Sequence, residues 1–132
     1  MRPQPGLDSL TSLLEQVGRA GLPVQLHVEG EPAALPRGID LSVYRIVQEG
    51  LTNALKHAHA RSADVTLRYQ PHELQLEIRD DGTGNGASYG LGHGLIGIRE
   101  RVKIYGGEMN AGTVNDGGFV LVTRLPLADE AR

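Results

Sequence analysis

The feature that most restricts the fold is a long stretch of helical periodicity, residues 39–60, flanked on both sides by segments with strand periodicity. Before it, residues 24–30 read VQLHVEG and alternate apolar with polar side chains. After it come two more alternating segments, 63–70 and 73–80, which a tight turn joins. Because every such element must bury its apolar side against another layer, this order favours a layered domain of helices on a sheet.

The rest of the chain continues the pattern. Leucines at helical spacing predict a helix over residues 7–20. Another helix is expected over 95–105, ended by Gly106 and Gly107, and two last strands flank a turn at 115–117. In chain order this is helix, strand, helix, paired strands, helix, paired strands. It predicts an α+β fold, a two-layer sandwich with one mixed sheet and the helices packed on one face.

Length and charge narrow the class of protein. A chain of 132 residues suffices for one core, so we expect a single domain over 7–132, with 1–6 a linker remnant. The net charge of −3 argues against a nucleic-acid partner, which would require a basic patch. The absence of cysteine excludes disulfides and thiolate chemistry. No apolar run approaches the roughly 20 residues that span a bilayer, so we expect a soluble domain without membrane contact.

The long helix carries a polar face of unusual chemistry. At about 100° per residue, four functional side chains share that face: Glu49, Asn53, Lys56 and His57. Ser42 and Arg45 extend it. The opposite face is apolar and consists of Val43, Tyr44, Val47, Leu51, Ala54, Leu55 and Ala58. A carboxylate, a carboxamide, an ammonium and an imidazole together can hold a metal-phosphate. An ordinary surface helix also has a polar face, and that interpretation accounts for Ser42 and Arg45 and stays open for His57.

A second candidate site lies where the strand of residues 73–80 ends. Asp80 and Asp81 are followed by Gly82 and Gly84. Glycines at this point allow the backbone to approach a flat ligand closely, and a carboxylate at a strand end can accept a hydrogen bond from an amine. Asp-Gly is also a hairpin signal, but a glycine-rich loop follows here and no returning strand. The pattern therefore favours a ligand site over a simple turn.

The segment GLGHGLIGIRERV, residues 90–102, contains the pattern G-x-G-x-x-G from Gly92 to Gly97. A dinucleotide-binding turn requires a strand directly before the first glycine and an acidic residue about 20 positions later. A loop precedes Gly92, and Gly112 stands where the acidic residue would be, so the dinucleotide interpretation fails. The segment leads instead into a helix start, where free N–H groups can bind phosphate. Its residues there are Gly92, His93, Gly94 and Leu95.

Three blocks, QEGLTNALKHA, DDGTG and GHGLIGIRERV, resemble in order and spacing the N, G1 and G2 boxes of the Bergerat ATP-binding fold. That fold belongs to the GHKL superfamily of gyrase, Hsp chaperones, histidine kinases and MutL. YRIVQEGLTNALKHA together with GIRERV and YGGE is most similar to sensor histidine kinases of the nitrate-sensor (NarX/DesK) type. The resemblance covers the chain from Leu7 onward. It implies a catalytic domain that binds ATP and Mg²⁺ and donates the γ-phosphoryl group to a histidine on a separate dimerisation domain.

The resemblance also implies a role for each site residue. Glu49 corresponds to the general base or water-orienting carboxylate, and Asn53 to the ligand of the Mg²⁺ that bridges the ATP phosphates. Lys56 and His57 would contact phosphate, and Asp80 would accept the exocyclic amine of adenine. The pocket floor would be shaped by Gly82 and Gly84. The residues that would close over the triphosphate are Gly92, His93, Gly94 and Leu95. Thr123 either assists Asp80 at the adenine or is an inward-facing core threonine.

Partners and alternatives follow from the same resemblance. No histidine stands in the acceptor context of an acidic neighbour on a long helix, so we expect the phosphoacceptor domain to lie upstream, with a response regulator as the indirect partner. The isolated domain is expected to be a cytoplasmic monomer, within a kinase that is membrane-anchored or not. Two alternatives stay open: an anti-sigma-factor-type serine kinase, and a nucleotide-binding regulatory module without transfer activity. Gly50 departs from the alanine usual in the family, at a cost of about 1 kcal/mol of helix stability.

Overall fold

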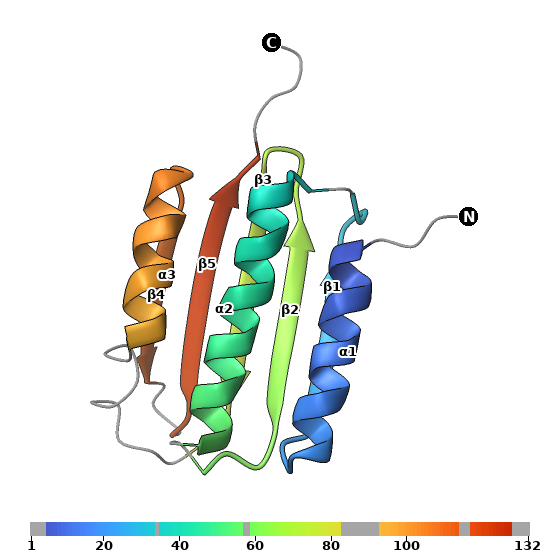
Figure 1. Cartoon of the computed structure of the whole chain (residues 1–132), viewed down its shortest axis with the longest axis vertical. Coiled ribbons are helices and arrows are strands. Elements are labelled where there is room, and N and C mark those ends of the chain that lie inside the picture. Colours follow the sequence, from blue (N-terminus) through green and yellow to red (C-terminus); the bar gives the residue numbers. More distant parts are fainter. Residues whose placement is uncertain (1–4, 34, 57–58, 83–92, 114–116, 128–132) are drawn as a thin grey trace.

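The computed structural model describes residues 5–33, 35–56, 59–82, 93–113 and 117–127. Its helices are α1 (Pro5–Arg19), α2 (Arg37–Lys56) and α3 (His93–Ile104). Its strands are β1 (Val24–Glu29), β2 (Ala63–Tyr69), β3 (Glu73–Asp80), β4 (Glu108–Thr113) and β5 (Phe119–Pro126). The five-stranded sheet has the order β1-β2-β3-β5-β4, in which only the β1–β2 pair is parallel. All three helices cover one face of this sheet (Figure 1), which confirms the predicted two-layer α+β sandwich.

The helix boundaries differ from the prediction at both ends of the long helix. α2 begins at Arg37, inside the expected connector, and ends at Lys56 rather than at Ala60. His59 adopts a φ of 55°, a left-handed conformation incompatible with a continuing helix. The third helix begins at His93, two residues before the predicted start. No helix in the described ranges is both long and apolar enough to cross a membrane.

Two helices end in the same glycine-dependent motif. After α3, Gly106 has a φ of 83°, and the N–H of Gly107 donates to the carbonyl of Val102 at 2.9 Å. After α1, Gly21 has a φ of 118°, and the N–H of Leu22 donates to the carbonyl of Val17 at 3.1 Å. Both are Schellman endings, in which a residue with positive φ lets the chain satisfy the last helical carbonyls. Glycine adopts this conformation without steric cost, so both stops were readable in the sequence.

The core lies between the sheet and the helices, with α2 at its centre. The buried residues of α2 are Ile39, Ser42, Val43, Ile46, Val47, Leu51 and Ala54. Ser42 is only 1% exposed, so its predicted place on the solvent-facing polar side is wrong. Because α2 is flanked by α1 on one side and α3 on the other, its buried arc is wider than its apolar stripe. Arg45 is exposed, as expected, while Tyr44 and Leu55 are only half-buried. Ala58 lies outside the described residues.

At Gly50 the backbone of α2 comes close to side chains of the sheet. A β-carbon at this position would lie 3.0 Å from the Cδ1 of Ile78 on β3 and 3.7 Å from the Cδ2 of Leu121 on β5. The helix backbone therefore lies close to β3 at this point. The missing methyl group, which is unfavourable for helix propensity, has a packing reason in this fold.

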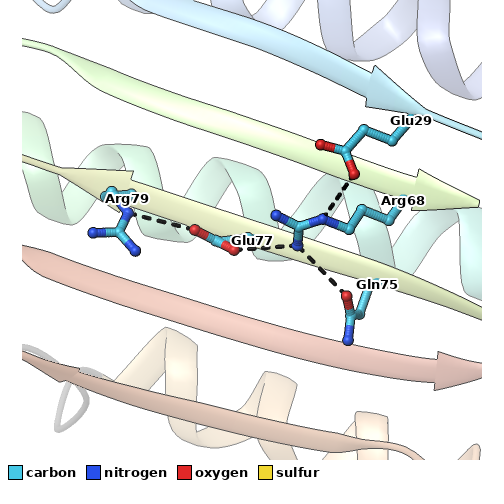
Figure 2. Close-up of polar contacts among 5 residues, drawn as sticks. All are labelled: Glu29, Arg68, Gln75, Glu77 and Arg79. Carbon is cyan, nitrogen blue, oxygen red and sulfur yellow. Dashed lines mark hydrogen bonds and ion pairs between the residues drawn. The ribbon is translucent and has the colours of Figure 1, made fainter.

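The face of the sheet away from the helices is charged and linked across the strands (Figure 2). Arg68 on β2 donates to Glu29 on β1 at 3.0 Å and to Glu77 on β3 at 3.2 Å. Arg79 pairs with the same Glu77 at 3.4 Å. On the neighbouring strand, Arg124 pairs with Glu73 at 3.3 Å. Opposite charges across neighbouring strands stabilise an open sheet face, so this side needs no helical cover.

Candidate functional site

Three elements end or begin at the same end of the sandwich. The ring of Tyr105, just after α3, packs so closely against Gly38 at the start of α2 that a β-carbon there would overlap its hydroxyl. α2 and α3 are therefore antiparallel, and the start of α3 lies beside the end of α2 (Figure 1). β3 also ends here, since it runs alongside α2 from the Gly50–Ile78 contact. The predicted site residues that the structure describes lie at or near these three ends.

The α2 wall presents the polar stripe that the sequence predicted. Glu49 and Asn53 are half-buried, one turn apart on the same face, and Lys56 is exposed at the last residue of the helix. The stripe runs along the margin of the buried arc, where Glu49 and Asn53 are neither in the core nor fully exposed. His57 lies outside the described residues. Such a half-sheltered position suits groups that must reach a ligand.

The β3 wall carries Asp80 at the final position of the strand. Its side chain is only 5% exposed and lies on the helix-facing side, since burial alternates along β3. The Oδ1 of Asp80 accepts a hydrogen bond from the backbone N–H of Gly82 at 2.7 Å. From the Gly50–Ile78 contact, Asn53 lies about 4.5 Å further along α2 and Asp80 about 6.6 Å further along β3. The carboxylate and the carboxamide are thus brought to adjacent positions on two walls.

The third wall is the N-terminus of α3. Its first turn is formed by His93, Gly94 and Leu95. The first N–H groups of a helix have no partner within it, and together with the helix dipole they favour an anion. Gly84 and Gly92, the other predicted loop residues, lie outside the described residues, whereas Gly82 is described and buried.

Asp81 is the residue that sequence reasoning passed over. Its position beside Asp80 assigned it no role, but its carboxylate accepts three hydrogen bonds from Arg61 and Ser62. These bonds, the backbone N–H of Ser62 above all, hold the pKa of Asp81 below its usual value. The available signal was its position directly after Asp80, where the strand ends. Its partners Arg61 and Ser62 lie about 20 residues earlier in the chain, and no sequence pattern indicated that they contact Asp81.

Thr123 does not reach the adenine side of the site. In the sheet register Thr123 pairs with Leu76, whereas Asp80 pairs with Phe119. Four residues along a strand correspond to about 13 Å, too far for both side chains to contact one adenine amine. Thr123 is fully buried, and its hydroxyl is one of two buried side-chain atoms without a hydrogen-bond partner in the described part of the chain. The core interpretation of Thr123 is the one that its position supports.

We expect Thr123→Val to raise the free energy of unfolding by about 1 kcal/mol, since it removes a buried hydroxyl that has no partner and keeps the shape. Chemical denaturation measures this change. Thr66→Val, at the other buried threonine of the sheet, is the control, because its hydroxyl is not among the unpartnered atoms of the described residues. A loss of ATP affinity in Thr123→Val would restore Thr123 to the adenine site.

The oxygen ligands suit a metal that arrives with phosphate. Among the described residues, no three His, Cys, Asp or Glu side chains gather into a metal site of their own. Glu49 and Asn53 supply a carboxylate and a carboxamide oxygen on one helix face. Magnesium typically takes one or two protein oxygens and completes its shell with phosphate oxygens and water. The donor set therefore fits Mg²⁺ bound through a nucleotide.

Comparison with known proteins agrees with this geometry. Residues 38–129 match the family described as histidine kinase-, DNA gyrase B- and HSP90-like ATPase. Over 125 residues the chain is 33% identical to the sensor histidine kinase LnrJ of Bacillus subtilis. The aligned part covers 94% of this chain and 31% of LnrJ. It is 29% identical over 126 residues to the nitrate/nitrite sensor protein NarX of Escherichia coli, covering 93% of this chain and 21% of NarX. The chain thus spans a third or less of these relatives.

A solved structure shows the same architecture. The catalytic domain of the histidine kinase ThkA superposes with a TM-score of 0.70 at 12% sequence identity, covering 96% of this chain and 92% of that domain. At this identity the likeness concerns the fold. It includes the mixed sheet with helices on one face, in a chain of nearly the same extent.

Proposed function

The chain belongs to the family of histidine kinase-, DNA gyrase B- and HSP90-like ATPases, and we propose that it binds Mg-ATP between α2, β3 and α3 and donates the γ-phosphoryl group to a histidine of a separate domain. The observation that carries this proposal is the meeting of three elements at one end of the sandwich. There, α2 carries the half-buried Glu49 and Asn53, Asp80 is buried at the end of β3, and the N-terminus of α3 lies beside the end of α2. The catalytic domain would comprise residues 7–132.

The adenine end of the ligand would lie at Asp80. Its side chain is sheltered from water, and a carboxylate is an acceptor for the exocyclic amine of adenine. Gly82, next to it, is buried and has no side chain that would obstruct a flat base. Gly84 would continue this pocket floor. A site of this kind distinguishes adenine from a purine that carries a carbonyl in place of the amine.

The phosphate end would lie between α2 and α3. Asn53 would hold the Mg²⁺, which when bound neutralises phosphate charge, and Lys56 and His57 would contact phosphate directly. The first turn of α3, with Gly92 before it and His93, Gly94 and Leu95 in it, would offer backbone N–H groups to the triphosphate. Glu49 would orient or deprotonate the attacking group. Phosphoryl transfer asks a protein mainly for such positioning and charge neutralisation.

The acceptor would be supplied by another domain. LnrJ and NarX are sensor kinases of which this chain matches 31% and 21%, so most of each relative lies outside the matched part. We propose a dimerisation domain with the phosphoacceptor histidine as the direct partner and a response regulator as the indirect one. The isolated domain would be a cytoplasmic monomer, without nucleic-acid or membrane contact of its own.

The experiment that tests this function supplies the missing acceptor. The chain is mixed with the dimerisation domain encoded by the same gene, and with ATP labelled on the γ-phosphate. We expect label on that domain in an acid-labile, base-stable form, which is the behaviour of a phosphorylated histidine, and no label when its acceptor histidine is replaced by alanine. An acid-stable product on serine would indicate the anti-sigma-factor type of kinase. ATP binding without any transfer would indicate a regulatory module.

A further inference from the structure

The carboxylate of Asp81 joins two segments that are far apart in the sequence. Its Oδ1 accepts hydrogen bonds from the backbone N–H groups of Arg61 at 2.8 Å and Ser62 at 3.0 Å. Its Oδ2 accepts the hydroxyl of Ser62 at 3.3 Å. In return, the N–H of Asp81 donates to the carbonyl of Ser62 at 3.3 Å. Both oxygens and the backbone of one residue are thus engaged with the connection that leads from α2 into β2.

These contacts connect the two side walls of the proposed site. Asp80, the last residue of β3, pairs with Ala63, the first residue of β2. The contacts of Asp81 lie one residue beyond this terminal pair. On the other side, the connection is attached to α2, because the N–H of Ala60 donates to the carbonyl of Ala54 at 3.4 Å. Ala54 directly follows Asn53. A short path of hydrogen bonds therefore runs from the Asn53 turn through the connection to Asp81 and its neighbour Asp80.

The electrostatics of Asp81 agree with this geometry. The N–H of Ser62 contributes most to lowering the pKa of the carboxyl group, and the N–H of Arg61 and the hydroxyl of Ser62 add to it, while desolvation opposes them. The group is therefore charged at neutral pH, and its hydrogen bonds are the stronger, charge-assisted kind. The hydrogen bonds from Arg61 and Ser62 direct the carboxylate of Asp81 to the α2–β2 connection.

We propose that Asp81 is a positioning residue for the adenine site, which holds the end of β3 against the α2–β2 connection and thereby keeps the Asp80 carboxylate where it meets the exocyclic amine. The proposal rests on the proposed function, because Asp81 acts only through Asp80. It adds a determinant of base specificity outside the residues that contact ATP. Loss of the Asp81 contacts would leave the phosphate end of the site in place and reduce the preference for adenine over other bases.

The test compares ATP with inosine triphosphate, which has a carbonyl in place of the adenine amine. The wild-type chain is expected to prefer ATP by roughly tenfold to a hundredfold, since a carboxylate opposite a carbonyl gains no hydrogen bond. Asp81→Ala is expected to raise the Kd of ATP about tenfold and that of inosine triphosphate by at most about twofold, so the preference falls about tenfold. Asp81→Asn keeps an acceptor oxygen for the two N–H groups, so its preference for ATP should fall by only about two- to threefold.

Asp64→Ala is the matched control. It removes an aspartate of β2 whose partner is His27, at 3.0 Å on the open face of the sheet, and it should leave the preference for ATP unchanged. Titrations are run well below the melting temperature of every variant, so that a mere loss of stability does not alter the ratio of the two Kd values. A wild-type preference that Asp81→Ala retains in full would overturn the proposal. If Asp81→Ala does not fold, an unaltered preference in Asp81→Asn has the same meaning.

The same data separate this proposal from the function on which it rests. A wild-type chain that binds both nucleotides equally would contradict the adenine role of Asp80, and with it the role of Asp81. A wild-type chain that prefers ATP, together with an unchanged preference in the Asp81 variants, would contradict the role of Asp81 alone. Loss of the preference in both Asp81→Ala and Asp64→Ala would also count against it, since the effect would then not depend on the Asp81 contacts.

Discussion

Asp80→Asn is expected to weaken ATP binding by roughly tenfold to a hundredfold, because it removes a charge-assisted hydrogen bond of about 1.5–3 kcal/mol. The substitution keeps the size of the side chain and an oxygen for the N–H of Gly82, which donates to Oδ1 at 2.7 Å. We therefore expect the substitution to change ATP affinity and to leave the local fold intact. Calorimetric titration with Mg-ATP measures it.

Asp64→Asn is the matched control for this prediction. It exchanges the same two groups on the neighbouring strand β2, but its side chain is about half exposed on the far face of the sheet, beside His27. ATP affinity should be unchanged in this variant. An affinity equal to the wild type in Asp80→Asn would remove Asp80 from the adenine site, and the proposed binding mode would have to be abandoned.

Leu51→Ala is expected to lower the free energy of unfolding by about 2–5 kcal/mol. Leu51 is completely buried in α2, within the core between this helix and the sheet. Its truncation loses the transfer free energy of the removed carbons and leaves a cavity that the packed surroundings fill only in part. For a domain whose net stability is on the order of 5–15 kcal/mol, this is a substantial fraction. Urea denaturation with an unchanged m-value is the appropriate measurement.

Leu41→Ala provides the control on the same helix. The residue type and the substitution are the same, but Leu41 is 48% exposed, so we expect a change of at most about 0.5 kcal/mol. Equal losses in the two variants would mean that α2 does not bury the face described above. The orientation of the Glu49–Asn53 stripe toward the ligand would then be wrong as well.

Much of the fold was predictable because its signals are local. The alternation in β1, β2 and β3 and the helical spacing in α2 identified these elements, since periods of 2 and 3.6 are properties of the backbone itself. The stops at Gly21 and Gly106 were predictable because positive φ is accessible to glycine without strain. The end of α2 was not, because His59 adopts positive φ without being glycine.

In the candidate site, too, some features follow from local patterns and others depend on packing between distant residues. The stripe of Glu49, Asn53 and Lys56 follows from helix geometry, and the strand-end position of Asp80 from strand alternation. That the two groups lie on adjacent walls depends on α2 resting on Ile78 through Gly50, a contact between residues distant in the chain. The exclusion of Thr123 from the adenine side depends likewise on the register of β3 with β5.

Local patterns in the chain were therefore enough to predict the element types, their order, two of the helix ends and the chemistry of the side chains that would bind a nucleotide. Three features depend instead on how the elements pack. Ser42 is buried, Thr123 lies about 13 Å along the sheet from Asp80, and Asp81 accepts hydrogen bonds from Arg61 and Ser62. The physical reason is the sequence distance over which each interaction acts. Periodicity and backbone preference act within a few residues, whereas burial, register and hydrogen bonding between segments depend on how separate elements pack.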